Sequence, residues 1–248
     1  SIGLMAAAGT AARDPEVASL FDGSNGVDWA AYGGTFGEQH YSPLDQINSD
    51  SIGKLGLAWK VDLPTQNSVS EPLEIDGTLY YVTGYGVVHA ADARSGKLYW
   101  TYDPKTWEKA GHKLGVGWGS RGIAWWKGKI YVGTQDGRLI AIDAKTGKQV
   151  WSQMTVDPND YNYITGAPRV FAGKVIIGFG GADVGHSRGY VSTYDAQTGK
   201  LLWRWYVVPG NPAKGFENKA MAMAAKTWHG QWWRYGGGGT VWNSFAYD

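Results

Sequence analysis

Short apolar runs separated by glycine-containing turns recur along the chain. Segments such as "GKIYVGTQ" and "GRLIAIDA" (residues 128–135 and 137–144) are rich in β-branched and aromatic residues and carry turn residues at their ends. Similar pairs occupy residues 77–93 and 173–196. No helical period separates one pair from the next. The pattern therefore predicts an all-β fold of short antiparallel strands.

A longer repeat is superimposed on these pairs. Each pair ends in one copy of a nine-residue motif, "DARSGKLYW", "DAKTGKQVW" or "DAQTGKLLW". The copies begin at Asp92, Asp143 and Asp195 and end at Trp100, Trp151 and Trp203. A period of 51 to 52 residues belongs to stacked or radial repeat architectures. The glycine of each copy predicts a tight turn with positive φ, leading into a short strand that ends on the tryptophan.

Three to four strands per repeat predict the blades of a β-propeller, with four antiparallel strands in each blade. The repeated tryptophan is expected to pack across the seam to the next blade, as a large flat side chain can. "LGLAWKVDLP" (residues 55–64) resembles the end of an earlier blade, with Trp59 in the docking position. "GGGGTVWNSFAYD" (residues 236–248) begins another blade. At most about four blades are expected, the last one cut, so the chain predicts part of a larger ring.

Composition removes several classes of partner. The chain has 23 Lys and Arg against 22 Asp and Glu, so neither a nucleic acid nor an anionic membrane surface is indicated. No cysteine is present, which excludes a disulfide or haem-attachment motif in these residues. No apolar run reaches the ~20 residues of a transmembrane segment. Residues 1–28 are expected to form a separate N-terminal segment, either partly disordered or left over around a cleavage site.

Three blocks of sequence resemble the pyrroloquinoline quinone (PQQ)-dependent alcohol dehydrogenases, or quinoproteins. They are "WAAYGGTFGEQHYSPLDQIN" (29–48), "ITGAPRVFAGKVIIGFGGADVGHSRGYVSTYDAQTGKLLWRWYVVPG" (164–210) and "AMAAKTWHGQWWRYGGGGTVWNS" (222–244). Members of that family are eight-bladed propellers about twice this length. The resemblance therefore implies that residues 29–248 form about half of an eight-bladed ring, incomplete at its C-terminal end.

The resemblance also implies a cofactor site. PQQ is a flat o-quinone with three carboxylates, so its site needs aromatic faces, cations and hydrogen-bond donors. Positions matching the family's cofactor contacts are Arg121, Thr165, Gly180, Gly181, Ala182, Thr240 and Trp242. A guanidinium pairs with carboxylate and carbonyl oxygens, glycines permit close backbone approach, and an indole stacks on a planar ring. The residues alone also allow a blade-edge arginine, a bulged strand end and one more docking tryptophan.

Asp183 stands where the family usually has a glutamate that binds Ca²⁺. The shorter side chain keeps the charge but leaves the metal less defined, so a lanthanide is an alternative. Two other positions depart from the family. Gly115 and Val116 lie where many relatives have adjacent cysteines, and Val69 replaces a cofactor-contacting glutamate. Glu71, on the same strand face as Val69, is a candidate replacement and stays unassigned.

The implied reaction oxidises an alcohol to an aldehyde or ketone, with hydride passing to the quinone C5 and Ca²⁺ acting as Lewis acid. The family's catalytic aspartate lies beyond these residues, so no general base is nominated among Asp62, Asp92, Asp143 and Asp195. The resemblance further implies a periplasmic enzyme with a cytochrome electron acceptor and leaves a haem c domain open. The alternative is a non-catalytic propeller scaffold resembling the outer-membrane assembly lipoproteins. A WD-repeat module fits less well, since its period is shorter.

Overall fold

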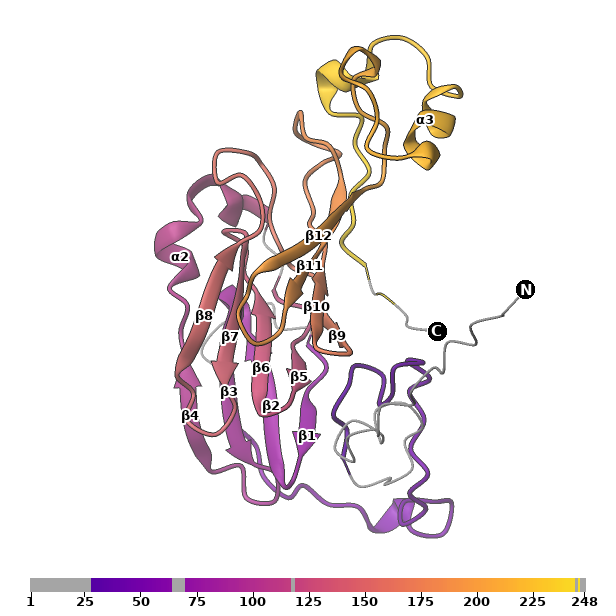
Figure 1. The fold of residues 1–248 in the computed structure, drawn as a ribbon. Helices are drawn as coiled ribbons and strands as arrows, with labels where there is room; N and C mark the ends of the chain where they lie inside the picture. The colour runs from indigo at the N-terminus through magenta and orange to yellow at the C-terminus, as the bar shows by residue number, and fades with distance from the viewer. Residues whose placement is uncertain (1–27, 64–69, 117–118, 244, 246–248) are drawn as a thin grey trace, which may run out of the picture.

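The computed structural model describes residues 28–63, 70–116, 119–243 and 245. Residues 1–27, which hold nearly all of the N-terminal segment expected to be disordered or processed, lie outside the described residues. The residue at position 69 does so too. Within them the chain forms three four-stranded antiparallel sheets, each a meander in sequence order (Figure 1). The predicted all-β architecture with four-stranded blades is therefore confirmed.

The strands are as follows. The first sheet contains β1 (Leu73–Ile75), β2 (Thr78–Thr83), β3 (Val87–Asp92) and β4 (Leu98–Tyr102). The second contains β5 (Ala124–Trp126), β6 (Lys129–Gly133), β7 (Arg138–Asp143) and β8 (Gln149–Met154). The third contains β9 (Arg169–Phe171), β10 (Lys174–Ile177), β11 (Tyr190–Asp195) and β12 (Leu201–Tyr206). The fourth strand of each sheet runs past its repeat tryptophan instead of ending on it.

The aspartate of each repeat copy closes the turn before the outer strand. Asp143 Oδ1 accepts hydrogen bonds from the Thr146 backbone N–H at 2.8 Å and from the Thr146 hydroxyl at 2.7 Å. The other two copies make the same pair of bonds, Asp92 with Ser95 and Asp195 with Thr198. These bonds hold the carboxylate pKa values below the usual range. The repeat aspartates are thus committed to turn structure.

The repeat tryptophans join neighbouring sheets. Trp100 Nε1 donates to the carbonyl oxygen of Ala144 at 3.0 Å, and Trp151 Nε1 donates to that of Ala196 at 3.1 Å. Each indole also lies on the glycine of the next repeat turn, where φ is positive. Trp59 makes the equivalent bond to Ala93 at 3.1 Å, as its predicted docking position requires. Trp203 lies on the outer face of the third sheet and is 44 % exposed.

Apolar side chains fill both seams between the sheets. Buried residues such as Val82, Val88 and Ile140 occupy the seam between the first and second sheets. Tyr131 and Tyr194 are among those in the seam between the second and third. This burial fixes the angle at which successive sheets meet, and hence the positions of the loops at their ends.

Residues 29–40 lie along the inner strands, an arrangement that the strand pattern did not predict. Trp29 pairs with Glu74 of β1 through two backbone hydrogen bonds of 2.8 and 3.1 Å. On the third sheet, the Arg169 guanidinium lies 4.1 Å from the centre of the Tyr32 ring and forms an ion pair with Glu38. This segment therefore ties the inner edges of the first and third sheets together.

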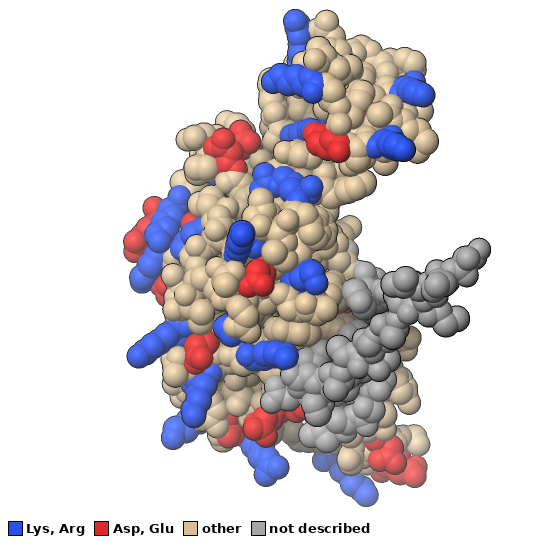
Figure 2. All heavy atoms as spheres, in the orientation of Figure 1, with Lys and Arg blue, Asp and Glu red and all other residues tan. Residues whose placement is uncertain are grey.

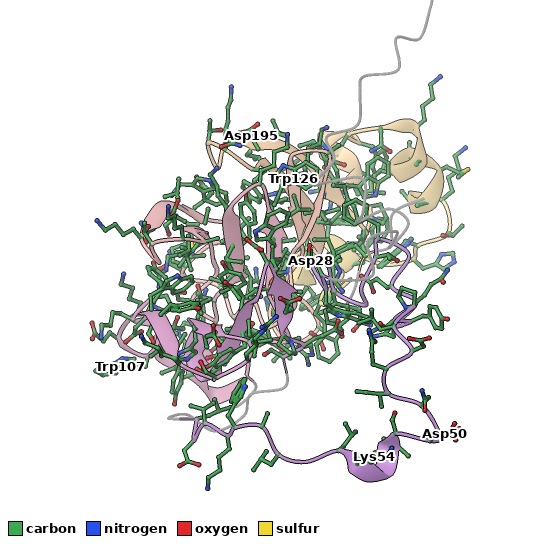
Figure 3. The ribbon with its side chains drawn as sticks, turned by 90° about the horizontal axis from the view of Figure 1, so that it is seen from below. Asp28, Asp50, Lys54, Trp107, Trp126 and Asp195 are labelled. Atoms are coloured by element: carbon green, nitrogen blue, oxygen red, sulfur yellow. The ribbon has the colours of Figure 1, made fainter. Side chains whose placement is uncertain are left out.

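The sequence pattern also missed the helices of the described part of the chain. They are α2 (Thr106–Lys109), α3 (Lys219–Ala225) and the 3₁₀ turns η1 (Ile52–Lys54), η2 (Gly84–Gly86), η3 (Gly111–Val116), η4 (Pro212–Lys214) and η5 (Trp232–Tyr235). In the stick view, η1 with Lys54 stands away from the sheets (Figure 3). No helix of the described residues has the length and apolar character needed to cross a membrane.

An excursion between β12 and the final segment carries α3 and projects beyond the third sheet (Figure 1). Asn218 caps α3 by accepting a hydrogen bond from Met221 N at 2.9 Å. Trp232 Nε1 donates to the carbonyl of Pro209 at 2.8 Å and anchors the far end of the excursion. Its visible surface is mostly uncharged, with scattered Lys and Arg side chains (Figure 2). The excursion returns the chain to the loops of the third sheet, where the candidate site lies.

Candidate cofactor site

Three segments meet at one end of the third sheet: residues 163–166, 178–183 and 238–242. Tyr163 and Gly180 form a two-residue antiparallel bridge, with N–H···O distances of 3.1 and 2.9 Å. The third segment crosses the second, where Val241 N donates to the Phe179 carbonyl at 3.0 Å. A Cβ on Gly178 would overlap the Val241 carbonyl oxygen, so only glycine permits this crossing.

Arg121 joins the second sheet to these segments. Its backbone N–H donates to the Thr165 carbonyl at 2.8 Å, and its Nη1 donates to Thr165 Oγ1 at 2.5 Å. The guanidinium carbon lies 4.7 Å from the centre of the Trp242 ring. Arg121 thus contacts two other residues predicted from the sequence, Thr165 and Trp242, which lie 44 and 121 positions further along the chain. Trp242 keeps 39 % of its surface exposed.

Asp183 and Thr240 form a second pair. The Thr240 hydroxyl donates to Asp183 Oδ1 at 2.7 Å. The Gly180–Gly181–Ala182 loop leads into Asp183 and is buried, with Ala182 only 2 % exposed. Gly181 has a φ of 98°, and an added Cβ there would overlap the backbone of Tyr161. The loop therefore requires its glycine, and it presents the Asp183 carboxylate at the surface.

Tyr163 belongs to the same group of side chains, although sequence reasoning did not select it. Burial raises the pKa of its phenol, the negative charge of Asp183 raises it further, and the positive charge of Arg121 opposes both effects. The phenol ring lies beside Gly180, three residues before Asp183. A usable signal was its position two residues before Thr165, on the same face of an extended segment.

Glu71 uses its carboxylate to hold the chain's own donors. Its Oε1 accepts from the Trp29 indole N–H at 2.6 Å and from the Gly33 backbone N–H at 2.7 Å. His40 Nδ1 lies 3.5 Å from the other oxygen. The backbone of Glu71 bridges to Gly122, the neighbour of Arg121. Glu71 thus links the segment along the inner strands to the arginine loop.

The donor set fits a flat, carboxylated quinone. It offers a guanidinium, two threonine hydroxyls, a phenol and a partly exposed indole face. The residues fit a metal ion less well than they fit the quinone. In the described part of the chain, no three or more His, Cys, Asp or Glu side chains are grouped so that they could hold a metal ion. Asp183 is the one acidic ligand that the resemblance identifies in this site. The remaining oxygens around a metal would have to come from other donors.

Comparison with known proteins decides the family. The PQQ glucose/ethanol/alcohol dehydrogenase β-propeller domain matches residues 29–248. The chain belongs to this family.

Relatives in the PQQ family are bacterial alcohol dehydrogenases. The chain is 52 % identical over 225 residues to quinohemoprotein alcohol dehydrogenase ADH IIB of Pseudomonas putida, covering 90 % of this chain and 32 % of that protein. The crystal structure of quinohemoprotein alcohol dehydrogenase from Comamonas testosteroni superposes with a TM-score of 0.82 at 49 % identity, covering 89 % of this chain and 33 % of that one. A europium-containing methanol dehydrogenase gives a TM-score of 0.80 at 30 % identity, covering 95 % of this chain and 42 % of that one.

These comparisons confirm the predicted PQQ-family resemblance and the propeller fold. They give no support to the scaffold alternative, since the relatives named are dehydrogenases. The chain spans about a third of the length of the curated relatives it matches.

Proposed function

We propose that the protein is a PQQ-dependent alcohol dehydrogenase in which this chain supplies one side of the cofactor site. The observation that carries the proposal is the cluster of Arg121, Thr165 and Trp242, assembled from three distant segments. An arginine that only covered a blade edge would need no such partners. Among the residues that the structure describes, the Trp242 indole also lacks the hydrogen bond to an alanine carbonyl by which Trp100 and Trp151 dock on the next sheet.

Each residue of the site has a chemical role in this proposal. The Trp242 indole offers a stacking face for the planar ring system. Arg121 pairs with a carboxylate or quinone oxygen, where its fixed charge and forked donors hold the ligand in one orientation. The Thr165 hydroxyl accepts from Arg121 and keeps its own proton to donate to the ligand. The Thr240 hydroxyl, by contrast, would donate to the ligand only in place of Asp183.

Asp183 is proposed as a metal ligand for Ca²⁺, with a lanthanide as the alternative. A hard cation prefers oxygen ligands, and this carboxylate is exposed at the end of a rigid loop. Its hydrogen bond to Thr240 orients one oxygen and leaves the other available. The lanthanide alternative is supported by the europium-containing methanol dehydrogenase among the structural relatives.

When bound, PQQ supplies a two-electron acceptor for the hydride of the alcohol. The described residues bind and orient it, and Arg121 provides positive charge beside its oxygens. No general base is assigned to this chain, since Asp92, Asp143 and Asp195 are engaged in their turns. We place the catalytic aspartate in other blades of the full-length protein, and further propose a periplasmic location and a cytochrome electron acceptor. A relative is named 1-butanol dehydrogenase (cytochrome c).

Activity of the reconstituted full-length protein tests the proposal. Apoprotein loaded with PQQ and Ca²⁺ should oxidise a primary alcohol with reduction of an artificial electron-acceptor dye. Arg121→Ala and Trp242→Ala should each lower kcat/KM by at least about tenfold, as expected for loss of a charged hydrogen bond or a stacking face. The matched controls, Arg94→Ala in an exposed turn of the first blade and Trp107→Ala in α2 after that blade, should keep wild-type activity. A loaded protein inactive toward every alcohol tested would overturn the proposal.

A further inference from the structure

Tyr163 lies among the candidate site residues, yet no comparison and no resemblance assigns it a role. It precedes Thr165 by two residues in an extended segment, so the two side chains share a face. Thr165 is bonded to Arg121 on that face. The direction of the backbone therefore aims the phenol of Tyr163 toward the same space as the guanidinium.

The ring of Tyr163 covers Gly180. A Cβ built on Gly180 would lie 2.6 Å from Cε2, 2.7 Å from Cζ and 3.0 Å from the hydroxyl oxygen of Tyr163. The two residues are paired through their backbones, which fixes the ring in this place. The space that a glycine leaves open for a ligand is thus filled here by the end of an aromatic side chain.

The hydroxyl of Tyr163 lies beside Gly180, at the start of the loop that leads to Asp183. Both the Asp183 carboxylate and the Arg121 guanidinium act on the phenol electrostatically. Tyr163 therefore adjoins both parts of the site. It precedes Thr165, which bonds Arg121, by two residues, and its ring covers Gly180, three residues before Asp183. A neutral phenol in that place has one proton to donate to an anionic oxygen.

We propose that Tyr163 is a cofactor-binding residue of this site, whose hydroxyl donates a hydrogen bond to a carboxylate or quinone oxygen of PQQ. The resemblance matches Gly180 to a loop whose backbone approaches the cofactor, and here the Tyr163 ring covers that glycine, so the Tyr163 hydroxyl is the group offered at this place. This inference rests on the proposed function and adds Tyr163 to the residues that would hold the cofactor.

Binding of PQQ to full-length apoprotein in the presence of Ca²⁺, followed by quenching of tryptophan fluorescence, tests the inference. Tyr163→Phe keeps the ring over Gly180 and removes only the hydroxyl. We expect it to weaken PQQ binding about tenfold, the usual effect of losing one hydrogen bond to a charged group. The control Tyr102→Phe removes a phenol that bonds Gln149 between the first two blades, and it should bind PQQ as wild type does.

The outcomes separate this inference from the proposed function. Wild-type protein that fails to bind PQQ contradicts both. Wild-type binding with an unchanged affinity in Tyr163→Phe shows that the ring only packs on Gly180, and overturns the inference alone. A second variant, Tyr163→Ala, should bind at least as weakly as Tyr163→Phe. If it bound more tightly than wild type, the ring would be an obstacle to the cofactor and not a ligand.

Discussion

Arg121 illustrates how single residues define this site. Its backbone and its side chain both bond Thr165, so the guanidinium has little freedom to turn away. It also lies over the Trp242 ring, which means that the cofactor either takes the other face of the indole or displaces the arginine toward its edge. Both cases keep a fixed positive charge beside a stacking surface, which is the feature that a carboxylated ring system needs.

His89 gives a prediction about pH at the same scale. Its ring lies in β3 between the hydroxyl oxygens of Thr83 at 3.0 Å and Thr101 at 3.1 Å, and it is stacked on Tyr81. Burial lowers the pKa of His89 below its usual 6.5. Below pH 6.5 the unfolded chain therefore binds a proton at His89 that the folded chain does not bind. The free energy of unfolding should fall as the solution is acidified.

The effect can be isolated by comparing full-length protein with its His89→Gln variant. Wild type should lose up to about 1.4 kcal/mol of unfolding free energy per pH unit between the unfolded and folded pKa values, through this residue alone. Urea denaturation at pH 7.5 and 5.5 measures the loss. The variant should show a smaller decrease, whereas equal decreases in both proteins would mean that His89 does not titrate as its burial indicates.

At the scale of the elements, the repeat explains why Asp, Gly and Trp recur together. The aspartate closes the turn, the glycine takes its positive φ, and the preceding sheet's tryptophan lies on that glycine. Gly147 has a φ of 69°, and an added Cβ would approach the Trp100 ring to 2.6 Å. Each turn is therefore both the end of one strand and the docking surface for the neighbouring blade.

Gly147→Ala should consequently destabilise the protein more than an alanine at a glycine that has the same backbone but open surroundings. Gly128 is the matched control, since its φ is 74° and no atom lies within 4 Å of its added Cβ. We expect about 1 kcal/mol for Gly128→Ala from backbone strain, and about 3 kcal/mol for Gly147→Ala, where overpacking against Trp100 is added. Equal losses in the free energy of unfolding would show that the indole yields without cost.

The repeat also explains what could be predicted from the sequence. The strands, turns and docking tryptophans depend on local residues at a fixed period, and they were predicted. The helix α3 depends on seven residues capped by Asn218, too short for a periodic signal. Tyr163 and the segment around Tyr32 depend on contacts between distant positions, such as Tyr163 with Gly180 and Tyr32 with Arg169. Spacing along the chain could have placed Tyr163 on the same face as Thr165, but it carries no information about contacts between distant positions.

At the scale of the whole molecule, two faces remain uncovered. One face of the third sheet exposes Trp203 and Trp205, each 44 % accessible, and the first sheet exposes Leu98, which is 50 % accessible. Trp203 occupies the position from which Trp100 and Trp151 dock on the next sheet. We therefore expect further blades of a ring to cover these faces, since apolar patches of this kind favour association in water.

The most direct test of the proposed cofactor site is an absorbance titration of the full-length apoprotein with PQQ, with and without Ca²⁺. The account predicts saturable uptake of one PQQ per protein that depends on Ca²⁺ and is weakened by Trp242→Ala. Absence of uptake under both conditions would contradict the proposed function. Uptake unaffected by Trp242→Ala would mean that the cofactor binds elsewhere.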